Sequence, residues 1–136
     1  MNKGTQELKA LIAVIDRNTA DLSNDLDVSE EYLKNLLKPS KEVPPRMLAK
    51  IKRLAIQQGR YDPDEDKYIV PKRLSIPKKV FIIRNALGAS RKDFASRIEN
   101  ASEQIVRNWE TGTTKLSAET FEEIVNLANK HSIIIE

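Results

Sequence analysis

The segment SEQIVRNWETG, residues 102–112, carries the side chains with the most definite chemistry in this chain. If the segment is helical after Ser102, Val106 and Trp109 share one face and must be buried, because positions four and seven residues onward lie on the same side of a helix. The polar side chains that then point away from this face are Glu103, Gln104, Arg107 and Asn108. Carboxylate, amide and guanidinium groups of this kind can hydrogen-bond to the edges of DNA bases in the major groove.

The four polar residues differ in the contacts expected of them. Gln104 is the best candidate base reader, since a side-chain amide can bond N6 and N7 of adenine together. Arg107 or Asn108 can read the same groove one turn later. Two roles stay open for Glu103, which can accept a hydrogen bond from cytosine or favour the positive end of the helix dipole. For all four, the alternative to facing DNA is an idle solvated face.

The elements that would position this helix occur twice in the chain. Apolar residues recur at helical spacing along residues 5–55 and again along residues 77–130. Equivalent residues are 72 positions apart in the first helix and 73 apart beyond the second, which marks one inserted residue. A cap residue, Asn18 or Ser90, opens the second helix of each copy, with an aspartate three residues later. We therefore expect a tandem repeat, against the alternative of chance agreement in apolar spacing.

The length and composition of the chain fit two small domains. A chain of 136 residues has room for one ordinary domain or for two of about 60 residues each. Hydrophobic content of 40% and charged content of 32%, with 5% aromatic residues, is typical of a folded, helix-rich protein. The net charge of +3 permits nucleic-acid binding without requiring it.

Two segments outside the repeated helices have open roles. The sequence GRYDPDEDKYIVPKRLSIPKK, residues 59–79, contains three prolines, an acidic turn and a short extended piece at YIV. We favour a connection of intermediate stiffness, and the alternative is a strand-like clasp or a basic minor-groove contact through Lys72 and Arg73. The ending HSIIIE, residues 131–136, can add a strand to a neighbour or cover the core.

The second copy resembles the phage-repressor and Cro type of helix-turn-helix domain, the XRE family, over nearly its whole length. The family pattern has an arginine in the first helix, serine caps on the second and third helices, an apolar residue before alanine in the second helix, and tryptophan-glutamate-x-glycine. This chain supplies these features at Arg84, Ser90, Ser102, Phe94 with Ala95, and Trp109-Glu110-Thr111-Gly112. One departure is IENAS, which is one residue longer than the usual turn between the second and third helices.

The resemblance implies roles for further residues. It implies that the helix after Ser102 enters the major groove, braced from behind by Trp109. The family's arginine in the first helix commonly pairs with the glutamate after the tryptophan, which implies a structural brace between Arg84 and Glu110. The residues implied to bind DNA phosphates rather than bases are Arg91, Thr113, Thr114 and Lys115.

The first copy resembles the same family more weakly, because it lacks the tryptophan, glutamate and glycine. At the positions of Arg84 and Glu110 it has Ile12 and Leu37, as expected if the two positions touch. Its possible second DNA site consists of Thr19, Glu30, Glu31, Lys34, Asn35 and Lys38. The two glutamates would be repelled by phosphates unless cytosines accept them, so DNA reading and dimerisation or partner binding both stay open.

Neither an active site nor a metal site is expected. The single histidine, His131, has no cysteine, serine motif or paired carboxylates to complete a catalytic site. The acidic stretch DPDED lacks the glycine and terminal glutamate of a calcium loop. Charged residues interrupt the first sixteen residues, so we expect no signal peptide or membrane helix and place the protein in the cytoplasm.

Together these observations predict an all-α chain of two tandem repressor-like helix-turn-helix bundles, with about five short helices each. The predicted domains are residues 1–58 and 77–136, joined by a linker at 59–76. The expected function is sequence-specific transcription regulation as a bacterial or phage repressor that binds double-stranded DNA, as a homodimer or as a single-chain pseudo-dimer, with no cofactor and no small molecule. The alternative is an antirepressor-like or antitoxin-like module that binds a protein partner.

Overall fold

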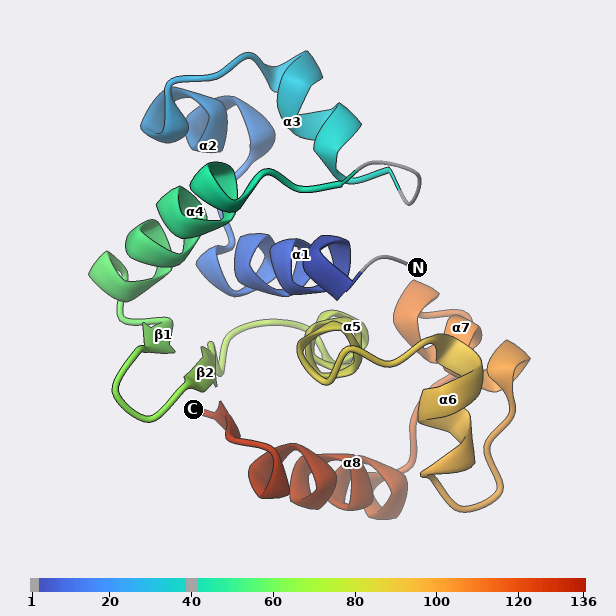
Figure 1. Cartoon of the computed structure of the whole chain (residues 1–136). Helices are drawn as coiled ribbons and strands as arrows, with labels where there is room; N and C mark the ends of the chain where they lie inside the picture. The colour runs from blue at the N-terminus through green and yellow to red at the C-terminus, as the bar shows by residue number, and fades with distance from the viewer. Residues whose placement is uncertain (1–2, 39–41) are drawn as a thin grey trace.

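The computed structural model describes residues 3–38 and 42–136, and within them the chain is mostly helical (Figure 1). The helices of the first half are α1 (Lys3–Ile15), α2 (Thr19–Leu26), α3 (Glu30–Leu36) and α4 (Pro45–Gln57). Those of the second half are α5 (Ile76–Ala86), α6 (Arg91–Ser96), α7 (Glu103–Thr111) and α8 (Ala118–Lys130). Three short strands complete the fold, and they are β1 (Tyr61–Asp62), β2 (Lys67–Val70) and β3 (Ile133–Ile135).

The predicted helical character is confirmed, but the chain is not all-α, because these strands form one sheet in the order β1-β2-β3. Each half also has four helices in the described residues, where about five were expected. The chain turns at a left-handed residue soon after the last helix of each half, at Gly59 (φ 71°) and at Ser132 (φ 63°). Aromatic or β-branched residues follow in both places, and such residues favour an extended backbone over a fifth helix.

The sheet joins the ends of both halves to one strand. Tyr61 of β1 pairs with Tyr68 in antiparallel register, and Tyr68 also pairs with Ile133 of β3 in parallel register. The segment assigned to a connection, residues 59–76, therefore contains two strands, and its Val70 side chain is fully buried. Both roles left open for residues 131–136 are present, because β3 pairs with β2 of the same chain and its Ile133 is buried in the core.

Local backbone signals recur at the offsets found in the sequence. Side-chain caps occur at Asn18, whose Oδ1 accepts from Asp21 N at 2.8 Å, and at Ser90, whose Oγ accepts from Asp93 N at 3.1 Å. Left-handed residues occur in pairs 72 or 73 positions apart, namely Asp16 with Gly88, Asp27 with Asn100, and Gly59 with Ser132. The two halves thus turn at equivalent places along the chain.

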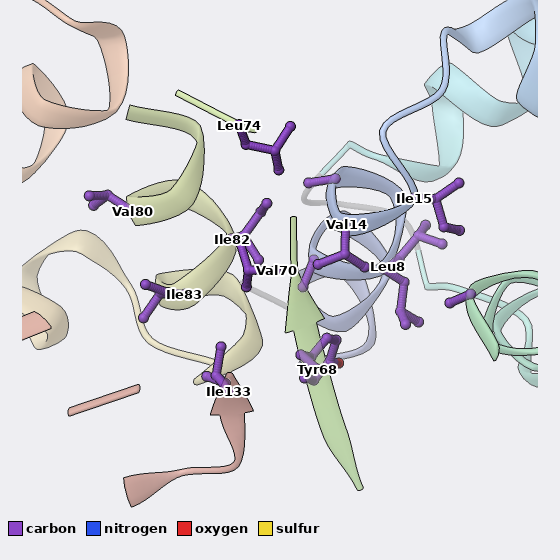
Figure 2. Packing of buried hydrophobic residues seen from close by; sticks show 14 of the residues in the cluster. Leu8, Val14, Ile15, Tyr68, Val70, Leu74, Val80, Ile82, Ile83 and Ile133 are labelled. Carbon is purple, nitrogen blue, oxygen red and sulfur yellow. The ribbon is translucent and has the colours of Figure 1, made fainter. Parts of the chain in front are cut away.

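The core is continuous between the two halves. Figure 2 shows Val70 on β2 lying between α5, which carries Ile82, and α1, which carries Val14, and all three side chains are fully buried. Helices α1 and α5 form the most extensive contact between the halves. Burial of apolar side chains from both helices therefore fixes how the halves sit together.

Polar contacts across α1 and α5 are reciprocal. Near the start of α1, Gln6 Nε2 donates to the carbonyl oxygen of Ala89, just beyond the end of α5, at 2.8 Å. Near the start of α5, Lys78 Nζ donates to Asp16 Oδ1, just beyond the end of α1, at 2.6 Å. In both cases a side chain near the start of one helix donates to a residue just beyond the end of the other, which is the pattern of a two-fold interface.

Candidate nucleic-acid interface

Helix α7 has defined signals at both ends. Ser102 Oγ accepts a hydrogen bond from Ile105 N at 3.2 Å and so caps the first turn. Gly112 ends the helix in the left-handed conformation, with φ 78°. In this conformation Thr113 N donates to the carbonyl oxygen of Asn108 at 2.9 Å, which satisfies a backbone acceptor of the last turn.

The two faces of α7 are clearly divided. Val106 is fully buried and Trp109 is 7% exposed, so both pack into the core of the second half. Glu103, Gln104 and Arg107 are exposed, and Asn108 is half-buried. Gln104 Nε2 donates to Asn108 Oδ1 at 3.0 Å, so in the free protein these two amides bond to one another. The face therefore presents amide, guanidinium and carboxylate groups on a helix that is held from behind.

A buried ion pair connects α5 to α7. Arg84 donates from Nε to Glu110 Oε2 at 2.5 Å and from Nη2 to Glu110 Oε1 at 3.1 Å, and both side chains are 3% exposed. Arg84 Nη1 also donates to the carbonyl oxygen of Ala89 at 3.0 Å. This forked geometry satisfies both carboxylate oxygens and holds the end of α7 against α5.

The residues expected to bind phosphates lie at two places near α7. Arg91 is the first residue of α6, and its Nη2 lies 3.2 Å from Glu110 Oε1. The other three follow α7 and are exposed, namely Thr113, Thr114 and Lys115. The hydroxyl oxygens of Thr111 and Thr113 are 2.9 Å apart, so the start of this loop is ordered by a side-chain hydrogen bond.

The turn before α7 is longer than its counterpart in the first half. It covers residues 97–102, whereas α2 and α3 are joined by residues 27–29. One residue of the difference is the insertion, and the rest arises because α6 ends earlier than α2. Glu99 N donates to Glu123 Oε2 of α8 at 2.9 Å, so the longer turn is tied to the last helix.

In the first half, α3 buries Leu33 and Leu36, as α7 buries Val106 and Trp109. Of the residues of the possible second DNA site, the exposed ones are Glu30, Glu31, Lys34 and Lys38. The half-buried ones are Thr19, at the start of α2, and Asn35. Side chains able to contact a duplex are thus present on α3 as well, with two glutamates in its first turn.

One residue of this region was missed from the sequence. Lys9 belongs to α1 in the first half, yet it lies within the electrostatic field of Arg84, Arg91 and Glu110 in the second half. Burial lowers the pKa of Lys9, and the charges of Arg84 and Arg91 lower it further, whereas Glu110 raises it. No local pattern identifies Lys9, because its neighbours come from helices more than 70 residues away in the chain.

Comparison of the chain with models of protein families, with curated proteins and with solved structures finds no match. Over residues 3–38 and 42–136, no helix combines the length and the apolar content that are needed to cross a membrane.

Proposed function

We propose that this protein is a sequence-specific regulator of transcription, a bacterial or phage repressor that binds double-stranded DNA through two helix-turn-helix units. In the second unit, α6 and α7 form the motif and α7 enters the major groove. Gln104, Arg107 and Asn108 read bases there, and Glu103 either accepts from cytosine or favours the helix dipole. Arg91 and the loop after α7 bind phosphates and so fix the position of the helix on the duplex.

The division of α7 into two faces is the observation that carries this proposal. Val106 and Trp109 are buried and the adjacent Glu110 is held by Arg84, so the helix cannot turn its polar face into the protein. The exposed side chains are those with donor and acceptor groups suited to base edges. To read a groove, a helix must be held in place by its buried face and must present polar side chains on its exposed face.

The reciprocal contacts between α1 and α5 support a single-chain pseudo-dimer. A two-fold relation between two reading units matches two half-sites about one helical turn of DNA apart. Because α3 and α7 carry different side chains, the two half-sites should differ in sequence. The first half would then read DNA with Lys34 and Asn35, and Glu30 and Glu31 would require cytosines as partners.

The first experiment is selection of bound duplexes from a random library, followed by point variants. Gln104→Ala should lower the binding free energy by about 1–3 kcal/mol and relax the base preference at one position of the site only, because one bidentate contact is lost. Lys115→Ala should weaken all sequences alike and reduce the salt slope by about one, because it removes a phosphate contact. Asn126→Ala is the matched control, because Asn126 is an exposed amide on α8. It should change neither the affinity for any duplex nor the salt slope.

The recovered site also tests the pseudo-dimer. Two unequal half-sites would support reading by both halves of one chain, and a perfect palindrome would indicate a homodimer that uses one unit per chain. Failure to enrich any duplex would contradict the proposal. It would favour a module that binds a protein partner, for which the acidic first turn of α3 and the 38% exposed Tyr32 are the supporting features.

A further inference from the structure

Three cationic side chains lie near one carboxylate, that of Glu110. Arg84 and Arg91 contact it directly, Lys9 of α1 is within electrostatic range of all three, and the four residues form what we call the Glu110 cluster. Three positive groups and one negative group leave a formal excess of positive charge inside a partly buried site. Such an excess is costly in the free protein and favourable once an anion binds.

The carboxylate of Glu110 is already used by the two arginines. Arg84 donates to both of its oxygens, and Arg91 Nη2 lies 3.2 Å from Oε1. The Nε of Arg91 is buried and has no hydrogen-bond partner among the described residues. Glu110 therefore leaves part of the hydrogen-bonding capacity of Arg91 unused, and it neutralises only one of the three charges.

Lys9 reaches this site from the other half of the molecule. Gln6, one turn earlier on α1, donates to the carbonyl oxygen of Ala89, so this part of α1 lies against the segment that leads into α6. Lys9 is half-buried, and burial together with Arg84 and Arg91 lowers its pKa. The protein thus disfavours the charged form of Lys9, which an arriving anion would stabilise.

We infer that Lys9 and Arg91 bind one stretch of DNA backbone together, so that the first half of the chain completes the phosphate contact of the second half. The inference rests on the proposed function and adds a residue that the helix-turn-helix unit itself does not contain. Arg91 supplies fixed, directional donors, and Lys9 supplies a compact ammonium on a flexible stem. Both contacts set the position of α7 on the duplex and are independent of base sequence.

The test compares duplex binding and stability in Lys9→Gln, Lys9→Arg and the parent protein. Lys9→Gln should bind all duplexes roughly five- to tenfold more weakly at about 0.1 M salt, with a salt slope reduced by about one, because one phosphate contact is lost. Its melting temperature should be unchanged or higher, because a charge beside two guanidinium groups has gone. Lys9→Arg should keep most of the affinity and the slope.

Lys130→Gln is the matched control, because Lys130 is an exposed lysine and the last residue of α8. The C-terminal end of α8 lies away from α6 and α7 (Figure 1). It should leave affinity and slope as they are. If the parent binds duplex and Lys9→Gln binds with the same affinity and slope, the inference about Lys9 is wrong while the proposed function stands. If the parent binds no duplex, both fail.

Titration with inorganic phosphate separates DNA from a free anion as the ligand. Binding of phosphate that is lost in Lys9→Gln, with duplex affinity unaltered, would assign the Glu110 cluster to a small anion and overturn the inference. Loss of stability in Lys9→Gln with unaltered duplex affinity would also overturn it, because Lys9 would then serve the fold alone.

Discussion

The Glu110 cluster of the second half has an apolar counterpart in the first. At offsets of 72 and 73 residues, and with the roles of α1 and α5 exchanged, the equivalents of Arg84, Glu110, Arg91 and Lys9 are Ile12, Leu37, Thr19 and Phe81. Ile12, Leu37 and Phe81 are partly buried against the core. They line one cavity of about 270 Å³ between the halves, together with Ala13 and four charged residues, Lys9, Asp16, Arg17 and Lys78. The two positions that hold the buried ion pair in the second half are thus apolar in the first half, although charged residues line the same cavity.

The comparison distinguishes the residues that the fold requires at these positions from those that binding of an anion would require. Apolar residues take the positions of the Arg84–Glu110 pair in the first half, so an ion pair at these positions is not required for the fold there. The ion pair of the second half is neutral overall, and the groups proposed to attract an anion are Arg91 of the same half and Lys9 of the first half. Helix α2 of the first half begins with Thr19, where α6 of the second half begins with Arg91. If α3 reads DNA, one cation that could bind phosphate is therefore missing beside it.

The largest effect is expected from removing the carboxylate. Glu110→Ala leaves Arg84 buried without a counter-ion, and breaking a buried pair in this way costs about 3–5 kcal/mol. Arg91 also loses its partner. Unfolding in denaturant, followed by circular dichroism, measures the loss.

The equivalent change in the first half is Leu37→Ala, which serves as the control. Replacing a fully buried leucine by alanine typically lowers the free energy of unfolding by about 2–5 kcal/mol. Leu37 is only half-buried, so the loss of stability in Leu37→Ala should be at the lower end of this range or below it. Equal losses in the two variants would mean that the buried charge adds nothing beyond packing, and the comparison between the halves would fail.

A smaller effect is expected when both members of the pair are exchanged for the residues of the first half. The double variant Arg84→Ile with Glu110→Leu should recover most of the stability that Glu110→Ala loses, because the buried guanidinium of Arg84 is removed together with its carboxylate and only the partly exposed Arg91 loses its partner. Its salt slope for duplex binding should equal that of the parent, because the pair contributes no net charge. A double variant as unstable as Glu110→Ala would show that the second half depends on the ions as such.

The smallest effect concerns the ion pairs that join the halves. Hydrogen bonds from Lys78, and then from Arg73, lower the pKa of Asp16 from its ordinary value of 3.8, and burial opposes them. The stabilisation is therefore present above pH 3.8 and is lost as the pH falls through the lower, folded-state pKa. Asp16→Asn should remove it, at a cost below about 1 kcal/mol at neutral pH because both cations are largely exposed.

Measurement of unfolding free energy against pH checks this last prediction. The parent and Asp16→Asn should differ at neutral pH and converge at acid pH, and the difference should shrink in about 1 M salt, where the Debye length is about 3 Å. A difference that persists at acid pH would trace to the left-handed backbone at residue 16 and not to its charge.

Much of the local structure was predictable from the sequence. The caps at Asn18 and Ser90 and the burial of Val106 and Trp109 follow from short-range rules that act within a few residues. The extended piece at YIV and the possible strand in residues 131–136 could also be read from their aromatic and β-branched residues. Their pairing, and the strand β1, could not, because both depend on partners elsewhere in the chain. Lys9 could not be found in this way, since its role depends on residues in the other half.

By itself, the sequence determined the order of the helices, their ends and the side of each that faces the core, because helical periodicity, caps and left-handed turns depend on neighbouring residues. Only the tertiary structure decided that α1 packs on α5, that one strand joins the ends of both halves, and that Lys9 lies within electrostatic range of Arg84 and Arg91. Such contacts depend on which apolar faces find each other in space, and residues far apart in the chain carry no local signal of that choice.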